Sequence, residues 1–482
     1  MDFRKTKVIC TLGPAIDSEE KVRALIRAGM NAARFNFSHG SHEEHLERLN
    51  MLKHVRDIMG RPVATVLDTK GPEIRIKKFA DGPITLEAGD IFTLTTEECD
   101  GSKERVSVTY ANLHQEVAPG QEILIDDGLV AVRVKEINGQ DIVCEVENGG
   151  GLSSNKSLNI PGVHVQLPAL TEKDISDIQF GVANDFDFVA ASFVRSADDV
   201  AQIRKVLADC GGENVKIIAK IENQEGVDNV EAILAAADGI MVARGDLGVE
   251  IPAARVPVIQ KQIIRMGLQV GKPIVTATQM LDSMIRNPRP TRAEVSDVAN
   301  AVYDGTSCVM LSGETANGKY PIEAVEAMVS IINEAEGSID FWHKFNKQIE
   351  KLRVQPTKQN INDAITHTCC LTAKDLEAKA ILAATSSGHT ARMICRFRPA
   401  CPVVALTTEE KVRRQLAITW GAIPLLTGSV NSTDRIFSLS AEVARKEGLV
   451  KEGDIVVITA GVPLGMSGST NMIEAQIITD EN

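Results

Sequence analysis

The sequence predicts an α/β protein: a (β/α)8 TIM barrel, an all-β lid domain inserted after the third barrel strand, and a C-terminal doubly wound α/β domain. Short apolar strands alternate with amphipathic helices over residues 6–68 and again over residues 171–336. Together the two stretches give about eight strand–helix units, the number that closes such a barrel. Between them, helical periodicity is weak and turn signals separate short β-type runs. Beyond a polar segment at 344–358, strands and helices alternate again, which is typical of an open doubly wound sheet.

Local patterns predict the individual elements. Capping boxes at Ser41, Thr171 and Thr291 mark three helix starts. The predicted barrel strands are 7–11, 32–36, 63–67, 186–190, 215–221, 239–243, 273–277 and 308–311, with helices at 18–28, 41–59, from 171, 196–209, 229–236, 256–270, 291–303 and 321–336. The other predicted strands are 84–86, 92–95, 122–125, 130–134 and 142–146 in the insert, and 380–384, 403–406, 423–426, 455–459 and 474–478 in the last domain. We therefore expect the barrel in residues 1–71 and 169–343, a small β-barrel lid in residues 72–168, and the C-terminal domain in residues 344–482.

Charge and composition disfavour several classes of function. The chain has 52 Lys and Arg against 65 Asp and Glu, a formal net charge of −13, which disfavours non-specific binding to nucleic acid or anionic lipid. An anionic substrate must therefore meet locally placed cations, a metal or backbone N–H groups. No apolar run reaches the roughly 18 residues of a membrane span. The nine scattered cysteines contain no Cys-x-x-Cys pair, which is typical of reduced thiols. We expect a cytoplasmic protein with no nucleic-acid or membrane partner.

The ends of the predicted barrel strands carry charged and hydroxyl side chains. The active site of a (β/α)8 barrel lies at the C-terminal ends of its strands, so these side chains are candidates for function. They are Arg34 and Asn36 at the end of the second strand with Ser38 and His39 just beyond it, Asp68, Thr69 and Lys70 at the end of the third, Lys220 and Glu222 at the fifth, Arg244, Gly245 and Asp246 at the sixth, Thr278 at the seventh, and Ser312 and Glu314 at the eighth.

Lys220 and Glu222 are the most informative of these residues. They are two positions apart, so on a strand both side chains project to the same face, where a barrel interior normally has branched apolar residues. A surface-exposed ion pair fits less well, because the apolar run 217–219 precedes them. Glu222 and Asp246, on adjacent strands, supply two carboxylates to one mouth, which matches Mg²⁺. Four cations around such a metal would favour a phosphate or carboxylate substrate: Arg34, Lys70, Arg75 and Lys220.

Other patterns are less specific. His39, His42 and His45 suggest zinc, but their spacing differs from His-Glu-x-x-His, and we expect the last two to face solvent at a helix start. No Gly-x-Gly-x-x-Gly or Gly-x₄-Gly-Lys-Ser/Thr motif occurs, so neither a Rossmann nor a P-loop nucleotide site is predicted.

In the last domain, small and hydroxyl residues join a predicted strand to a helix. They are Thr385, Ser386, Ser387, Gly388, His389 and Thr390. The N–H groups at a helix start favour phosphate binding, but an ordinary capped turn is an equally good interpretation. A second run at 465–470 is a candidate to close over such a phosphate.

Longer motifs carry a resemblance to a known family. They are the segments 10–14 (CTLGP), 33–40 (ARFNFSHG), 67–75 (LDTKGPEIR), 218–223 (IAKIEN), 241–248 (MVARGDLG), 276–281 (TATQML), 287–294 (NPRPTRAE) and 310–315 (MLSGET). In this order and over essentially the whole chain, they resemble the pyruvate kinase family. The resemblance is greatest to the bacterial form, without the additional C-terminal domain that some members carry.

The resemblance implies a phosphotransferase that moves the phosphoryl group of phosphoenolpyruvate to ADP, giving pyruvate and ATP in the last step of glycolysis. It implies that Glu222 and Asp246 ligate Mg²⁺ (or Mn²⁺), and that Lys220 neutralises the transferring group. The remaining implied roles are Thr278 and the backbone of Gly245 for the substrate carboxylate, Arg34 for its phosphate, Asn36, Ser38, Asp68 and Thr69 for K⁺, Asn36, His39, Arg75 and Lys156 for the nucleotide, and Ser312 and Glu314 for proton delivery through Thr278 and water.

The resemblance also implies a homotetramer, a K⁺ requirement associated with Glu73, and a phosphorylated sugar or nucleotide as allosteric effector at residues 385–390. Two other functions stay open. A Mg²⁺-dependent barrel lyase acting on pyruvate or phosphoenolpyruvate would need neither the lid nor the segment 68–75. A non-catalytic phosphosugar sensor would need only the last domain.

Overall fold

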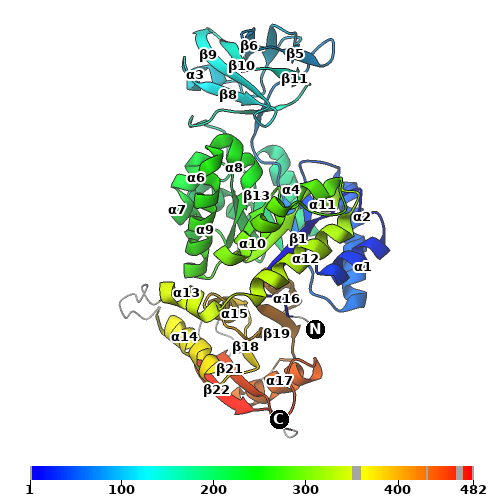
Figure 1. Cartoon of the computed structure of the whole chain (residues 1–482), viewed down its shortest axis with the longest axis vertical. Helices are drawn as coiled ribbons and strands as arrows, with labels where there is room; N and C mark the ends of the chain where they lie inside the picture. Colours follow the sequence, from blue (N-terminus) through cyan, green and yellow to red (C-terminus); the bar gives the residue numbers. More distant parts are fainter. Residues whose placement is uncertain (1–2, 350–359, 430–431, 463–469, 480–482) are drawn as a thin grey trace.

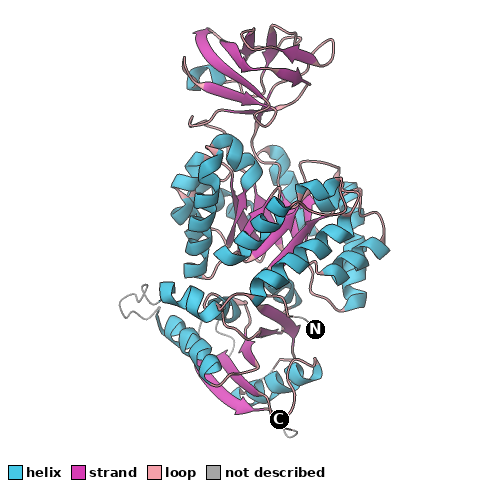
Figure 2. Cartoon of the chain, viewed as in Figure 1, coloured by secondary structure: helices cyan, strands magenta, loops and turns pink. Residues whose placement is uncertain are grey.

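The computed structural model describes residues 3–349, 360–429, 432–462 and 470–479. Figure 1 shows three tiers, with the insert at the top, the barrel in the middle and a C-terminal α/β unit below. In Figure 2 helices surround the barrel strands, whereas the insert consists of strands joined by loops, with one short helix. Among the described residues, no helix combines the length and the apolar character needed to cross a bilayer.

Eight parallel strands form the predicted closed barrel, in the order β1-β17-β16-β15-β14-β13-β3-β2. The strands are β1 (Lys7–Thr11), β2 (Ala32–Asn36), β3 (Ala64–Asp68), β13 (Phe188–Ala191), β14 (Lys216–Ile221), β15 (Gly239–Ala243), β16 (Ile274–Ala277) and β17 (Cys308–Leu311). The insert leaves the barrel after β3 and returns before β13. It therefore stands over the mouth formed by the C-terminal strand ends.

The helices around the barrel begin largely where the caps predict. The three predicted capping boxes are present: Ser41 with Glu44, Thr171 with Asp174, and Thr291 with Glu294. The helices are α1 (Glu19–Ala28), α2 (His42–Met59), α4 (Glu172–Ala183), α5 (Ala197–Asp209), α6 (Gln224–Asp228), α7 (Val230–Ala236), α8 (Arg244–Glu250), η1 (Ala253–Arg255), α9 (Val256–Val270), η2 (Asp282–Ile285), α10 (Arg292–Asp304), α11 (Gly313–Ala316) and α12 (Pro321–Gly337). One difference from the prediction is the extra short helix α6, which begins because the Asn223 side chain accepts a hydrogen bond from the N–H of Gly226 at 2.7 Å.

The insert is a seven-stranded mixed sheet in the order β4-β12-β8-β9-β10-β6-β7, with a separate pair β11-β5. Its elements are β4 (Ile74–Arg75), β5 (Ile84–Leu86), β6 (Ile91–Thr95), β7 (Arg105–Ser107), α3 (Leu113–Glu116), β8 (Glu122–Ile125), β9 (Val130–Asn138), β10 (Asp141–Asn148), β11 (Gly150–Leu152) and β12 (Ser157–Asn159). The predicted β-barrel is not one continuous closed ladder. Its edge strands β4 and β7 are instead joined beyond their ends by an isolated bridge between Ile76 and Val108. The short helix α3 departs from the all-β expectation.

The C-terminal unit has the predicted open sheet, in the order β20-β19-β18-β21-β22, with only β22 antiparallel to its neighbour. Its elements are α13 (Phe341–Ile349), α14 (Asn360–Asp375), β18 (Ala380–Ala384), α15 (His389–Cys395), β19 (Val403–Thr407), α16 (Glu410–Gln415), η4 (Leu416–Ile418), β20 (Ala422–Leu426), α17 (Thr433–Lys446), β21 (Ile455–Gly461) and β22 (Thr470–Ile477). Alternate residues of β18 pack on opposite helices. Ile381 packs in a cluster with α14 and α15, and Leu382 in a cluster with α17. The sheet is therefore covered on both faces.

The C-terminal unit closes the bottom of the barrel. Ala417 and Ile418 of η4 belong to the same apolar cluster as the inward side chains of the barrel strands. Nζ of Lys7, at the start of β1, donates to the carbonyl of Ala422 at 2.8 Å. Because one end of the barrel is plugged in this way, the opposite end beneath the insert is the open one.

Candidate active site

The mouth of the barrel opens into a cavity of about 630 Å³ between the C-terminal strand ends and the insert. Side chains from both parts line it. Among the sequence-predicted residues, the lining includes Arg34, Asn36, Ser38, His39, Arg75, Lys156, Lys220, Glu222 and Asp246. The structure therefore brings the predicted cations and carboxylates to one place.

Lys220, in β14, is the centre of a hydrogen-bond network at the base of this cavity. Its Nζ lies 2.7 Å from Oγ of Ser192, 2.9 Å from Oε1 of Glu222 and 3.1 Å from Oδ1 of Asp68. Burial by itself lowers the pKa of Lys220, but the carboxylates of Asp68 and Glu222 raise it above its usual value. The ammonium is therefore held in its charged form at the edge of the cavity.

Asp68 links Lys220 to a second cation, Arg34. Oδ2 of Asp68 accepts a hydrogen bond from Nε of Arg34 at 2.6 Å, and Nη1 of Arg34 donates to the hydroxyl of Thr11 at 3.0 Å. Burial favours the neutral acid, but Arg34 and Lys220 hold the pKa of Asp68 below its ordinary value. Asp68 thus stays ionised and orients two cations toward the same cavity.

Glu222 and Asp246 supply the two predicted carboxylates. Oε2 of Glu222 accepts the N–H of Phe193 at 2.6 Å, and Asp246 lies in the first turn of α8. Burial raises the pKa of Glu222 to about 7 against the charge of Lys220, and the charge of Asp246 adds to the rise. In the described part of the chain, no three His, Cys, Asp or Glu side chains converge as a metal cage. A carboxylate pair still fits Mg²⁺, which takes its other ligands from substrate and water.

Thr278 has an unusual backbone and ties the end of β16 to that of β15. Its φ of 66° lies in the left-handed region, which is rare for a β-branched residue. Its hydroxyl accepts the N–H of Gly245 at 2.7 Å and donates to the carbonyl of Ala277 at 2.6 Å. Arg244 supports this turn, because Nη2 donates to the carbonyl of Thr278 at 2.9 Å while the guanidinium pairs with Asp297 at 2.6 Å. The strained backbone of Thr278 therefore places the N–H of Gly245 beside the Thr278 hydroxyl.

Ser312 and Glu314 follow β17, next to the Thr278 turn in the barrel order. The buried carboxylate of Glu314 accepts the N–H of Leu281 at 3.0 Å and that of Ser312 at 2.7 Å. Burial raises the pKa of Glu314 above its ordinary value. Glu314 therefore joins the loops after β16 and β17 and retains a proton to higher pH than a free glutamate.

Three residues of this network are missing from the sequence-based candidates. Thr11 ends β1, and Ser192 and Phe193 follow β13. A hydroxyl or an aromatic residue after an apolar strand is too common to indicate a site. Only the rule that all eight strand ends surround the mouth would have included them.

Known proteins of one family match nearly the whole chain. The model of the pyruvate kinase barrel domain matches residues 3–325, and that of the pyruvate kinase alpha/beta domain matches residues 363–475. The chain belongs to the pyruvate kinase family. A pyruvate kinase of Clostridium acetobutylicum is 52% identical over 477 residues, covering 99% of this chain and 100% of the relative. One of Geobacillus stearothermophilus is 50% identical over 479 residues, covering 99% of this chain and 81% of the relative.

A solved structure supports the same assignment. The crystal structure of a pyruvate kinase from Cryptosporidium parvum has a TM-score of 0.93 and 40% identity, and the match covers 98% of this chain and 96% of that one. Pyruvate kinases are phosphotransferases of glycolysis that use phosphoenolpyruvate and ADP and require a divalent metal and K⁺. This chain is accordingly a phosphotransferase that forms pyruvate and ATP.

The residues that pyruvate kinase motifs assign to K⁺ come from two adjacent strands. Asn36 ends β2, Ser38 follows it and both line the cavity, whereas Asp68 and Thr69 at the end of β3 are buried. Asn36 and Asp68 are register partners in the barrel, and Oδ1 of Asn36 accepts the N–H of Ser38 at 3.2 Å. Hard oxygen donors therefore gather beside the cation pair.

The residues that the resemblance to pyruvate kinases assigns to the nucleotide lie on both sides of the cavity. Asn36 and His39 belong to the barrel, and Arg75 and Lys156 belong to the insert. Each insert cation is held by a carboxylate: Arg75 by Glu73 and Lys156 by Asp126, both at 2.9 Å. The cavity is therefore closed on one side by a separate structural unit.

The candidate effector segment lies in the C-terminal unit between β18 and α15, far from the mouth (Figure 1). Gly388 is the N-cap residue of α15 with a φ of 77°, and no side chain caps this helix. The hydroxyl of Thr390 is buried and lies 2.7 Å from that of Thr470. Of the predicted closing run at 465–470, residues 465–469 lie outside the described residues.

The expectation that His45 faces solvent is wrong. The His45 ring is buried and stacks on Phe37 with ring centroids 4.1 Å apart, and its Nε2 lies 2.9 Å from the carbonyl oxygen of His39. His42 instead pairs with Asp177 at 2.7 Å. The apolar contact with Phe37 explains the burial, since the loop after β2 folds back over the start of α2.

Proposed function

We propose that this cavity mouth carries out the phosphoryl transfer, with phosphoenolpyruvate against the barrel and ADP between barrel and insert. The observation that carries the proposal is the buried ammonium of Lys220, held by Asp68 and Ser192 at the edge of the cavity. Enzymatic phosphoryl transfer depends mainly on positioning and on stabilising the charge of the transferring group. A cation that is already oriented supplies both.

Lys220 and Arg34 would bind the phosphoryl oxygens of phosphoenolpyruvate. Asp68 orients both side chains, so little reorganisation is needed when the substrate arrives. The N–H of Gly245 and the hydroxyl of Thr278 would bind the substrate carboxylate. The N–H of Gly245 donates to the Thr278 hydroxyl at 2.7 Å, and that hydroxyl donates to the carbonyl of Ala277 at 2.6 Å. A carboxylate is a stronger acceptor that would take both hydrogen bonds.

Glu222 and Asp246 would hold the divalent metal, Mg²⁺ or Mn²⁺. The donor set fits, because burial raises the pKa of Glu222 against the charge of Lys220, and the nearby carboxylate of Asp246 adds to the rise, as expected where two carboxylates share one mouth. When bound, the metal neutralises and orients phosphoryl oxygens. Asn36, Ser38, Asp68 and Thr69 would hold K⁺ through side-chain and backbone oxygens.

Protonation of enolpyruvate would use the other side of the mouth. Thr278 lies beside the proposed carboxylate site, and Ser312 and Glu314 follow the next strand. Glu314, whose buried carboxyl has a raised pKa, would donate a proton through water and the Thr278 hydroxyl to the substrate carbon. This step is strongly favourable and drives ATP formation.

The insert would act as a lid. Arg75 and Lys156 on the insert, with Asn36 and His39 on the barrel, would bind the phosphates of ADP across the cavity. Movement of the insert toward the barrel would exclude water from the transferring group and strengthen the surrounding electrostatic interactions.

Regulation and assembly belong to the same proposal. The segment Thr385, Ser386, Ser387, Gly388 and Thr390 would bind the phosphate of a sugar-phosphate or nucleotide effector. The chain would work in the cytoplasm as a homotetramer, without a nucleic-acid or membrane partner. We propose the barrel as residues 1–71 and 169–343, the lid as residues 72–168 and the effector domain as residues 344–482.

An omission series tests the reaction. Pyruvate and ATP are measured with phosphoenolpyruvate, ADP, Mg²⁺ and K⁺, and then with each component left out in turn. The proposal expects both products together, and neither product without ADP or without Mg²⁺. Pyruvate formed without ADP would indicate a lyase or phosphatase, and no turnover at all would leave the phosphosugar sensor.

A further inference from the structure

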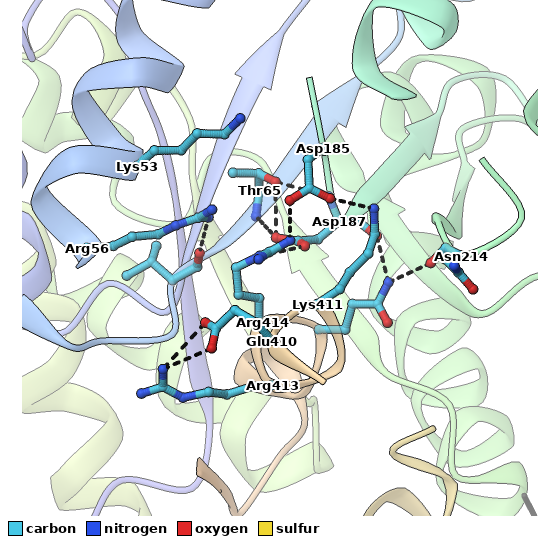
Figure 3. Close-up of polar contacts among 12 residues, drawn as sticks. Lys53, Arg56, Thr65, Asp185, Asp187, Asn214, Glu410, Lys411, Arg413 and Arg414 are labelled. Atoms are coloured by element: carbon cyan, nitrogen blue, oxygen red, sulfur yellow. Dashed lines mark hydrogen bonds and ion pairs between the residues drawn. The ribbon is translucent and has the colours of Figure 1, made fainter. Parts of the chain in front are cut away.

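A buried ion cluster joins the C-terminal unit to the bottom of the barrel (Figure 3). Nε of Arg414, in α16, donates to Oδ1 of Asp187 at 2.9 Å, and Nη2 pairs with Oδ2 of Asp185 at 2.7 Å. Asp187 is 0% exposed and Arg414 is 5% exposed. The adjacent Gln415 donates to the carbonyls of Asp187 at 3.2 Å and Asn214 at 2.8 Å. The end of α16 is therefore fixed to the barrel by both charge and backbone contacts.

Asp187 connects this cluster to two neighbouring barrel strands. Its Oδ2 accepts the backbone N–H of Thr65 at 2.9 Å and the Thr65 hydroxyl at 3.1 Å, and its own N–H donates back to that hydroxyl at 3.0 Å. Thr65 lies in β3, and Asp187 directly precedes β13. Burial raises the pKa of Asp187 above its ordinary value even with Arg414 beside it. Arg414 is thus a main ionic partner of the Asp187 carboxylate, which is fully buried.

The opposite ends of these two strands carry the groups that orient the catalytic mouth. Asp68 ends β3, and Ser192 and Phe193 follow β13. Asp68 and Ser192 both bind Nζ of Lys220, at 3.1 and 2.7 Å. The N–H of Phe193 binds Glu222 at 2.6 Å. Because β3 and β13 are paired from Val66 with Phe188 to Asp68 with Ala190, a shift at the bottom of the strands moves these groups at the top.

We propose that Arg414 is a positioning residue for phosphoryl transfer: through Asp187 it sets the axial position of β3 and β13, and so the placement of Lys220 and Glu222. The inference rests on the proposed function, because it assigns Arg414 a role in the geometry of that site. It also gives the C-terminal unit a continuous connection to the mouth. Leu406 of β19, shortly before α16, accepts the N–H of Thr385 in the candidate effector segment at 2.9 Å.

The test compares Arg414→Gln with Lys411→Gln, a control on the same helix. Lys411 pairs with the half-exposed Asp185 at 2.9 Å. The control substitution therefore removes a cation from the rim of the cluster. Both variants are assayed for pyruvate formation at a temperature where circular dichroism shows them folded. A misplacement of about 1 Å costs on the order of 100-fold in rate, so kcat of Arg414→Gln should fall roughly 10- to 100-fold while the control stays within about 2-fold. A lowered Tm with the kcat of the control would show a purely structural role and overturn the proposal.

Arg414→Lys is the second variant, in case the glutamine variant does not fold. It keeps a charge beside Asp187, but a single ammonium cannot span both aspartates as the guanidinium does. The kcat of Arg414→Lys should lie between those of the wild type and Arg414→Gln. Where Arg414→Gln does not fold, the kcat of Arg414→Lys should lie below that of the control Lys411→Gln. A kcat equal to that of Lys411→Gln overturns the proposal.

A double-mutant cycle with Ser192→Ala tests the route. If Arg414 acts through β13, the loss of kcat in the double variant is smaller than the product of the two single losses. A loss equal to that product shows independent action and contradicts the route. A wild type that forms no pyruvate refutes the proposed function, whereas an active wild type with an unaffected Arg414→Lys refutes only this inference.

Discussion

Lys220→Met is the substitution that most directly separates charge from shape at the mouth. Methionine has a similar length but removes a cation that contacts Ser192 at 2.7 Å, Glu222 at 2.9 Å and Asp68 at 3.1 Å. Loss of one preorganised group that stabilises transition-state charge costs about 10²- to 10³-fold in kcat. We therefore expect kcat to fall at least ~10²-fold.

The fold should survive this substitution because the two carboxylates keep other partners. Asp68 remains paired with Arg34 at 2.6 Å, and Glu222 still accepts the N–H of Phe193 at 2.6 Å. Pyruvate formation is measured by steady-state kinetics at pH 8, with Mn²⁺ binding followed by electron paramagnetic resonance on the same sample. Lys205→Met, at a largely exposed position on α5, is the matched control. Turnover of Lys220→Met within about 3-fold of that control would refute the role of the ammonium.

Three further predictions concern ions and regulation. Activity should require K⁺ in addition to Mg²⁺, because the position that the resemblance associates with the K⁺ requirement holds Glu73, whose carboxylate cannot supply the positive charge of the ion; equal rates in K⁺ and in tetramethylammonium salts would contradict this. Mn²⁺ binding to the substrate-free protein should weaken as pH falls below about 7, the pKa of Glu222, because a proton then occupies the metal ligand, and should level off above it. Calorimetry that finds one affinity from pH 5.5 to 8 would refute this linkage. A phosphorylated sugar or AMP should lower the phosphoenolpyruvate concentration for half-maximal rate by about 5- to 150-fold. Ser386→Glu should abolish that response by repelling the phosphate, whereas Thr408→Glu in the same unit should retain it; an unmoved wild-type saturation curve would reject the effector site.

The strand ends of the mouth could be predicted because the barrel has a repeating pattern. Once the strand–helix units are counted, the positions of Arg34, Lys220 and Asp246 at C-terminal strand ends follow from the chain alone. Capping boxes such as Thr171 with Asp174 likewise depend only on residues close in sequence. Here the local pattern and the final structure agree.

The residues that escaped prediction depend on contacts between distant segments. Ser192 has no distinctive neighbours in sequence, and its importance comes from Lys220, which reaches it from the adjacent strand. His45 is buried because the loop carrying Phe37 folds over it. Arg414 sits in a charged run that is typical of a solvated helix face, and only the docking of α16 on the barrel brings it to Asp187. Such contacts require the relative placement of whole units.

The central claim is that one phosphoryl group passes directly from phosphoenolpyruvate to ADP at this mouth. Phosphorus-31 nuclear magnetic resonance of the purified chain with phosphoenolpyruvate, ADP, Mg²⁺ and K⁺ follows donor and acceptor in one sample. We expect the phosphoenolpyruvate signal to decrease in step with the growth of the ATP γ-phosphate signal, without inorganic phosphate. Inorganic phosphate appearing in place of ATP, at a rate independent of ADP, would contradict it.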